Sequence, residues 1–435
     1  MKIQLVSILA VLLFTCASFA QLGRPEQLSA NVSRVNLTPP LEWQYSLGGY
    51  GERMSKPAAG IHDSIWVKAL VIKDAQKKYA LITMDILALP PNVKPEVLTL
   101  LAAGGWKSDN LMLLPSHSHA SLDMSAINDK NNLNNPYIGF YDPRLLEFVV
   151  NAIVKAVKQA DQDYKLVKIG TGREEVSGMN RNRRGENGVD EDLTVTRIDL
   201  GDNKPLAVLV NWTAHPTITG SEDMLVSGEW PGFLQKELEN LIDNNVLCMY
   251  FNGAEGDQSY VLKSREGDHY QQAEAYGKAM AAKAFSTYNT LKPAPISVFA
   301  YNSVTCKLPE PRLHPGFADT GGEEYGINEQ SAPYIFEAMC PASTEISALR
   351  LGDLLIVGAP GEMTYSLGGY IKKQLESKGV AYPVIGGLAN EWLSYILSPA
   401  QYAKGGYEAS VSFYGPELGP LISQSMMKAA GSLTN

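Results

Sequence analysis

The chain alternates between short apolar runs with strand character and longer segments whose apolar residues recur at helical spacing. The runs predict strands over residues 65–73, 79–84, 110–114, 193–200, 206–212, 246–251, 296–304, 347–351 and 354–358. The periodic segments predict helices over 144–160, 230–243, 269–288, 364–378 and 417–431. Several strands are apolar without interruption, which indicates a sheet covered on both faces. We therefore expect an α/β fold, with a mixed β-sheet core flanked by helices.

Two stretches lack these patterns. Residues 21–60 are rich in Pro, Gly and polar residues, and we expect an irregular lead-in there. Residues 308–338 are rich in Pro, Gly and acidic residues and predict a long loop. Strand patterns resume directly after that loop, so we expect one domain over 21–435 rather than two.

The first twenty residues have the organisation of a signal peptide. Lys2 precedes the apolar run 6–14, which is too short to span a bilayer, and small residues follow up to Ala20. We expect cleavage after Ala20 and a secreted or periplasmic protein. Lipid anchoring at Cys16 is disfavoured, because bulky residues stand where a lipoprotein signal needs small ones.

Composition narrows the range of partners. The chain is 45% hydrophobic and 19% charged, as in ordinary globular proteins, and its formal net charge is −9. An acidic chain is a poor match for nucleic acid, whose phosphates require a basic surface. No later stretch reaches the ~18 apolar residues of a transmembrane helix, so any membrane contact would be at the surface.

Cleavage would leave three cysteines, Cys248, Cys306 and Cys340. Cys248 lies in an apolar run that reads as a core strand. Cys306 and Cys340 flank the loop-rich stretch and could pair in an oxidising compartment. The chain has no Cys-x-x-Cys pair, which excludes a zinc ribbon.

Three of the six histidines directly follow predicted strands. His117 and His119 come after the run 110–114, and His215 comes after 206–212. Ligands of α/β sheets gather at the carboxyl ends of strands. In extended backbone, a His-x-His pair places both rings on one face. These histidines could bind a cation together, or they could be ordinary surface or loop residues.

Carboxylates occupy equivalent places. Asp257 lies in the polar loop 252–259 after a predicted strand, and Glu362 follows the run 354–358 just before a helix. Glu362 could simply cap that helix. Together with two histidines, however, one carboxylate makes the donor set of a catalytic zinc site with an open position. Such a site activates water and polarises a carbonyl.

Five short motifs carry a resemblance to a known family. They are Ser116-His117-Ser118-His119, Asn211-Trp212-Thr213-Ala214-His215, Gly256-Asp257-Gln258-Ser259, Pro360-Gly361-Glu362, and a stretch that runs from Gly387-Leu388-Ala389-Asn390 through Tyr395 and Tyr407-Glu408 to Tyr414-Gly415-Pro416. In this order they resemble the catalytic domain of the neutral, non-lysosomal ceramidases. Those enzymes are zinc amidases that cleave the N-acyl bond of ceramide.

The resemblance implies roles for individual residues. The residues that match the family's zinc ligands are His117, His215, Glu362 and Tyr395. His119 matches a histidine beside the metal that contacts substrate or reacting water, and Ser259 and Tyr407 match active-site residues. The role of Tyr395 depends wholly on the resemblance. The run 180–184 resembles a family Asn-Arg-Ser loop, but it could equally be a solvated basic loop.

The chain also departs from the family. We expect no C-terminal immunoglobulin-like domain, because only 19 residues follow Pro416. Gly405-Gly406 stands where the family has Gln-Arg, and Ala120-Ser121-Leu122-Asp123 replaces a glycine-rich sequence. These segments are expected to line the entrance for the substrate. The metal centre therefore looks retained, while the surface that recognises lipid does not.

The leading hypothesis is an exported, zinc-dependent amidohydrolase that cleaves an N-acyl bond of a lipid or small molecule by metal-activated water. His119 would act as acid and base, and Tyr407 and Ser259 would donate hydrogen bonds to the developing oxyanion or position the substrate. One alternative is the same chemistry on an ester, an acylated sugar or an acylated amino acid. Two further alternatives are a secreted binding protein without catalysis and a glycosidase that uses Asp257 and Glu362.

Overall fold

The computed structural model describes residues 28–434, and the expected signal peptide lies outside this range. Its largest element is an eight-stranded sheet with the order β11-β9-β8-β6-β1-β3-β4-β5. The strands are β1 Ser29–Asn36, β3 Trp66–Lys73, β4 Lys78–Met84, β5 Leu111–Pro115, β6 Lys165–Glu175, β8 Asp192–Leu200, β9 Pro205–Trp212 and β11 Leu247–Asn252. The outermost pairs β4–β5 and β9–β11 are parallel, and the other neighbours are antiparallel.

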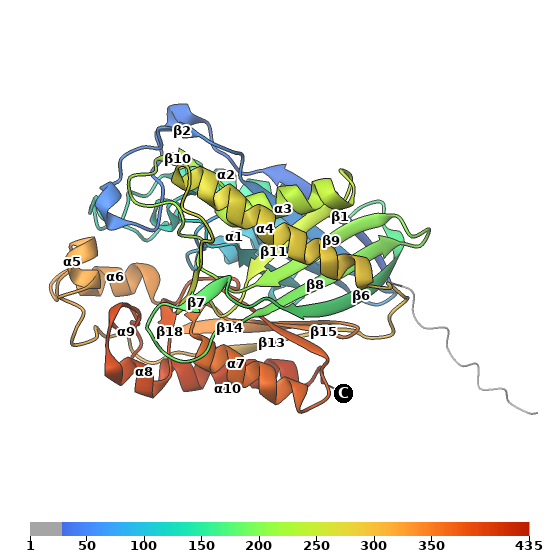
Figure 1. Ribbon diagram of the computed structural model, residues 1–435. Helices are drawn as coiled ribbons and strands as arrows, with labels where there is room; N and C mark the ends of the chain where they lie inside the picture. The colour runs from blue at the N-terminus through green and yellow to red at the C-terminus, as the bar shows by residue number, and fades with distance from the viewer. Residues whose placement is uncertain (1–27, 435) are drawn as a thin grey trace, which may run out of the picture.

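A second sheet packs against the first. It contains β13 Phe299–Lys307, β14 Ser343–Leu351, β15 Leu354–Gly358 and β17 Tyr382–Gly386, in that order. Figure 1 shows the two sheets stacked through the middle of the molecule. Buried residues of both sheets, among them Leu81, Met112 and Ile356, form one apolar cluster between them. The uninterrupted apolar strands are thereby explained, because helices cover one face and another sheet covers the other.

Helices form the two outer layers. Those beside the large sheet are α1 Val93–Leu101, α2 Pro143–Ala160, α3 Glu229–Ile242 and α4 His269–Thr290. Those beside the second sheet are α7 Tyr365–Glu376 and α10 Leu418–Gly431. In α2, for example, Val149 and Ile153 lie one turn apart and are both buried. The expected mixed α/β architecture is confirmed, with a helix–sheet–sheet–helix order of layers (Figure 1).

Two expectations for irregular segments are wrong. Residues 21–60 contain β1, which pairs with β3 along its whole length but with β6 only at Ser29 and Ala30. Its sequence, SANVSRVN, is polar because most of the strand is only half-buried. The expected loop 308–338 contains the short helix α5 Gly321–Tyr325 and most of α6 Ala332–Met339. In α6 the apolar residues Ile335 and Met339 are buried four residues apart, which is a helical spacing. The many Gly and Pro residues of the segment hide this spacing in the sequence.

The cysteines in residues 28–434 are free. Cys248 is buried in β11 as expected, and burial raises the pKa of its thiol. Cys306 and Cys340 do not form the disulfide considered above. Within the same range no helix has the length and apolar character needed to cross a bilayer.

Candidate active site

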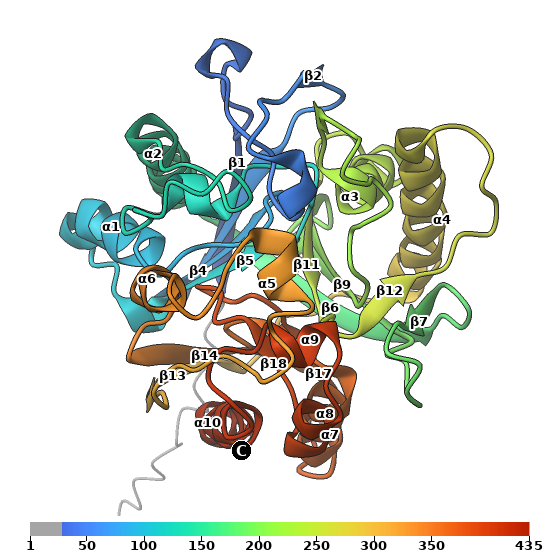
Figure 2. The same ribbon diagram turned by 90° about the vertical axis from the view of Figure 1, so that its left-hand side faces the viewer.

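The site forms where the two edges of the large sheet meet. The ends of β5 and β11 lie side by side, as Figure 2 shows. Asn252, the last residue of β11, donates through its amide to the carbonyls of Ala214 at 2.9 Å and Ser116 at 3.4 Å. It thereby joins the segments that follow β5 and β9, and each of these segments carries histidine.

His117 and His215 are buried and fixed by their Nδ1 atoms. His117 Nδ1 lies 2.8 Å from the Leu87 carbonyl, and His215 Nδ1 lies 2.7 Å from the Glu255 carbonyl. A carbonyl accepts only, so each Nδ1 carries the proton and each Nε2 offers a lone pair. His117 has a φ of 72°, a left-handed conformation that is costly for a residue with a side chain.

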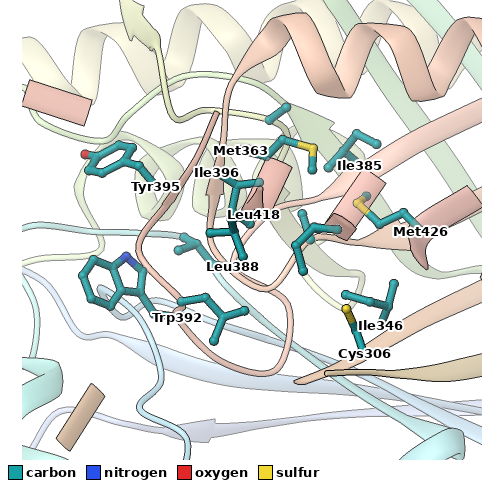
Figure 3. Packing of buried hydrophobic residues seen from close by; sticks show 14 of the residues in the cluster. Cys306, Ile346, Met363, Ile385, Leu388, Trp392, Tyr395, Ile396, Leu418 and Met426 are labelled. Atoms are coloured by element: carbon teal, nitrogen blue, oxygen red, sulfur yellow. The ribbon is translucent and has the colours of Figure 1, made fainter. Parts of the chain in front are cut away.

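Glu362 closes the cluster from the second half of the chain. Its Oε2 lies 3.0 Å from His215 Nε2 and 3.5 Å from His117 Nε2. Its Oε1 accepts a hydrogen bond of 2.8 Å from the indole N–H of Trp392. Figure 3 shows Trp392 and Tyr395 at one end of the apolar cluster that holds this region in place.

These three donor atoms fit a metal ion. Tetrahedral zinc with bonds of 2.0–2.1 Å places its ligand atoms about 3.3–3.4 Å apart, close to the separations just given. Burial is the main cause that lowers the pKa of His215, to about 4, and leaves a neutral imidazole. Burial alone would raise the pKa of Glu362, but its contacts with His117 and His215 outweigh burial and lower it. Metal binding requires neutral imidazoles and a carboxylate, the forms that the lowered pKa values of His215 and Glu362 favour.

Tyr395 is tied to Glu362 through the backbone. The short strands β16 Glu362–Met363 and β18 Tyr395–Ile396 are parallel, and Glu362 is the register partner of Tyr395. The Tyr395 hydroxyl accepts a hydrogen bond of 2.8 Å from Arg183. Burial raises the pKa of Tyr395, and the charge of Arg183 opposes that rise.

His119 stands beside the other two histidines. Its Nε2 lies 3.4 Å from His117 Nε2, and potential ligand atoms of the three rings all lie within 4.8 Å of one another. Tyr50 covers the ring at 4.9 Å between centroids. His119 Nδ1 is buried and has no hydrogen-bond partner among the described residues. Burial and the two neighbouring imidazoles lower the pKa of His119 well below its usual value.

A pocket opens onto this cluster. Polar residues in its lining include His117, His119, Glu362, Tyr395, Tyr407 and Asp123. Its walls are mostly apolar, with Leu87, Ala88, Met124, Ile138, Ile327, Ile335, Met339, Trp392, Val411 and Phe413. The Tyr407 hydroxyl lies 3.3 Å from that of Tyr325, and burial raises the pKa of Tyr407. The pocket can hold an apolar molecule with one reactive polar group near the histidines.

Two residues named from the sequence lie behind the pocket. Ser259 belongs to β12 Gln258–Tyr260 and forms a backbone bridge to His215, but it does not line the pocket within residues 28–434. Asp257 accepts hydrogen bonds from Asn182, Gln258 and the backbone of Tyr365. Asp257 is also absent from the described lining, so it does not share the pocket with Glu362 as the glycosidase alternative would require.

The structure adds residues that the sequence interpretation did not assign. Arg183, in the run left open as a basic loop, contacts Tyr395 and donates to Glu408 at 2.8 Å. Trp392 holds Glu362, and Glu255 is buried with both carboxyl oxygens unpartnered among the described residues. Arg183 could have been found from its family-like loop and Glu255 from the polar loop 252–259, whereas Trp392 carries no sequence signal of its own.

Comparisons with known proteins show the family of the chain. The model of the family described as neutral/alkaline non-lysosomal ceramidase, N-terminal, matches residues 32–274 and 326–422. The chain therefore belongs to this family. It is 22% identical to the neutral ceramidase of Pseudomonas aeruginosa, over 85% of this chain and 66% of that one. It is 30% identical to neutral ceramidase 1 of Arabidopsis thaliana, over 30% of this chain and 16% of that one.

The fold agrees as well. The crystal structure of neutral ceramidase from Pseudomonas aeruginosa superposes with a TM-score of 0.80 at 19% identity, over 94% of this chain and 75% of the other. A structure of ceramidase complexed with C2 superposes with a TM-score of 0.79 at 18% identity, over 94% of this chain and 75% of the other. At this identity the likeness establishes the fold alone. The chain spans about two thirds or less of the length of the curated relatives named here.

Proposed function

We propose that the protein is a zinc-dependent hydrolase that cleaves an N-acyl amide bond, with ceramide-like lipids as the first class of substrate to test. One observation carries the proposal: His117, His215 and Glu362 converge, and His117 and Glu362 also line a mostly apolar pocket. Membership in the ceramidase family supports the type of bond, because the named relatives are neutral ceramidases.

His117, His215 and Glu362 would hold the zinc ion, and Tyr395 would be the fourth protein ligand. Bound zinc supplies an activated water and polarises the acyl carbonyl. The carbonyls of Leu87 and Glu255 keep both Nε2 atoms unprotonated, which is the usual outer support of metal-binding histidines. Arg183 would position the Tyr395 phenol and offset its negative charge when it ionises.

The remaining residues handle the proton and the substrate. His119 is buried and held neutral by its surroundings. It would take up the proton that the attacking water loses and deliver it to the leaving nitrogen. Tyr407 keeps its proton because burial raises its pKa, and its hydroxyl can donate to the carbonyl oxygen as negative charge develops. Ser259 would act on the site through the His215 backbone.

The proposed domain covers residues 21–435, and export would follow from the signal sequence in residues 1–20. Cleavage after Ala20 predicts a mature N-terminus at Gln21. Mass spectrometry of the protein recovered from the periplasm or the medium would test this directly. A chain that retains residue 1 would contradict it.

The decisive experiment joins metal content to turnover. His117→Ala and His215→Ala should lose bound zinc and hydrolysis of a short-chain ceramide together, while His314→Ala, a histidine away from the pocket, should keep both. Zinc is measured by mass spectrometry and turnover by release of fatty acid. Full hydrolysis by a zinc-free His117→Ala protein would overturn the proposal.

A further inference from the structure

One acidic residue of the pocket has no place in the proposed chemistry. Asp123 lines the pocket together with His119, Tyr50 and Met124. Among the described residues that line the pocket, Glu362 is the other carboxylate, and it belongs to the proposed metal site. Asp123 lies in the segment that replaces the glycine-rich sequence of the ceramidases. It is therefore a feature of this chain rather than of the shared metal centre.

The backbone places Asp123 close to His119. Leu47 pairs with Leu122, and Gly48 donates its N–H to Ser121 at 3.0 Å. A β-carbon at Gly48 would lie 2.9 Å from Asp123 Cα, and one at the next residue, Gly49, would overlap the His119 ring. Asp123 and His119 therefore flank the same two glycines, on the side of the pocket that Tyr50 covers.

The Asp123 carboxyl is only partly used by the protein. Its Oδ1 accepts the backbone N–H of Ser125 at 2.8 Å and so caps the short helix Met124–Ile127. Its Oδ2 faces Gly139, where a β-carbon would lie 2.5 Å away, and it accepts no hydrogen bond from the described residues. Gly139 has a φ of 113°, so glycine both permits the turn and leaves room for this oxygen.

A half-buried acceptor in an apolar pocket favours ligands that bring a donor, because an unpaired polar group is costly there. We propose that the Asp123 carboxyl binds a hydroxyl or ammonium group on the amine part of the substrate, and so selects hydroxylated or amino-substituted N-acyl amines. The contact is expected on the amine part because Asp123 lies near His119, and a proton donor must face the leaving nitrogen. This step rests on the proposed function of His119.

The protonation state of Asp123 is compatible with both groups. Burial raises its pKa to about 7, against the Ser125 N–H and the charge of Arg53. Near neutral pH the two forms are therefore both populated. The carboxylate accepts from an ammonium or a hydroxyl, and the neutral acid can still accept from a hydroxyl through its carbonyl oxygen.

The test compares amides that differ by one group. Three probes share a dodecanoyl chain and carry ethanolamine, propylamine or ethylenediamine, so that hydroxyl, methyl and ammonium occupy one position. Wild type should cleave the hydroxyl and ammonium amides with a kcat/KM at least about tenfold above the methyl amide, since discrimination of this order follows from a buried hydrogen bond. Asp123→Leu should reduce both preferences to within about twofold.

Asp123→Asn separates a specific contact from a folding defect. Asn still caps the short helix and accepts from a hydroxyl, but it has no charge for an ammonium. This variant should keep the hydroxyl preference and lose about tenfold of the ammonium preference. Asp129→Asn, a change of the same charge at an exposed position, should keep both preferences. Thermal melting of each variant reports folding.

Several results would overturn the inference. They are a wild type that does not distinguish the three amides, preferences that survive Asp123→Leu, or a preference that follows a hydroxyl placed on the acyl chain of dodecanoyl propylamide instead. If wild type cleaves no amide, the proposed function fails instead. Calorimetric binding of the same uncleaved amides to wild type and Asp123→Leu then decides the role of Asp123 separately.

Discussion

Glu362 and Tyr395 are register partners across two parallel two-residue strands. The backbone of Glu362 donates to the Ser394 carbonyl at 3.1 Å, so the two side chains are carried by one small backbone unit. A hydrogen-bonded pair of strands holds side chains more firmly than two separate loops would. This pairing explains how a tyrosine far along the chain comes to stand beside a carboxylate of the proposed metal site.

The first prediction concerns that tyrosine. Tyr395→Phe removes the hydroxyl and keeps the ring, so the packing against Tyr407, at 5.9 Å between centroids, is retained. If the phenol is a ligand, zinc affinity should fall by about 10- to 100-fold, as measured by competition with a chelator. Tyr370→Phe, an exposed tyrosine, is the matched control. Unchanged zinc affinity in Tyr395→Phe would leave zinc with three protein ligands.

Trp392 should act on the metal through Glu362. Trp392→Phe deletes the N–H that donates to Oε1 while leaving an aromatic ring in the cluster. The freed carboxylate can rotate, so we expect zinc affinity to fall by about tenfold, with a smaller loss in unfolding temperature. Trp43→Phe removes an indole at a distant, partly exposed position and should leave zinc binding unchanged. Equal affinity in both variants would show that the hydrogen bond to Glu362 contributes nothing.

Gly49 should be needed for His119 rather than for zinc. A β-carbon there would overlap the His119 ring, and the φ of Gly49 is 90°. Gly49→Ala should lower kcat by about 100-fold, because misplacement by about 1 Å is enough for that, while zinc content stays full. Gly105→Ala is a matched control, with a φ of 77° and no atom within 4 Å. An active Gly49→Ala enzyme would argue against His119 as the proton carrier.

We expect the free energy of unfolding to depend on pH because of Glu255. Burial, reinforced by Glu362, raises the pKa of Glu255 well above its usual value, so the folded protein keeps a proton that the unfolded chain releases. Stability should therefore fall as pH rises above about 4.5, the ordinary range of a glutamate. Gln resembles the protonated side chain, so Glu255→Gln should match wild type near pH 4.5 and exceed it at pH 8.

Urea unfolding of zinc-free protein at the two pH values measures this difference. The exposed Glu310→Gln serves as the control for removal of one negative charge. A wild type as stable as Glu255→Gln at pH 8 would mean that a partner satisfies the Glu255 carboxylate in solution.

Long apolar runs predicted most of the fold. Strands such as β4 and β15 are buried along nearly their whole length, so their patterns are unambiguous. β1 was missed because its half-buried positions tolerate polar residues. The second sheet could not be anticipated either, since an apolar strand face does not reveal whether a helix or another sheet covers it.

The sequence likewise predicted some features of the site and not others. His117, His215 and Glu362 could be named because strand ends gather ligands and because their motifs resemble a family. The tautomers of the histidines could not, since the carbonyls of Leu87 and Glu255 fix them from other segments. Ser259 was placed by its motif, and its position behind His215 depends on a backbone bridge that no motif encodes.

The meeting of β5 and β11 at Asn252 has a consequence for how the protein matures. His215 and Glu362 lie 147 residues apart in sequence, and His117 comes from the opposite edge of the sheet. Contacts of such long range carry a large loop-closure cost, so we expect them to form after the more local contacts. The proposed metal ligands would therefore come together only after the domain has folded. Metal binding would then follow folding and could be used to detect the folded protein.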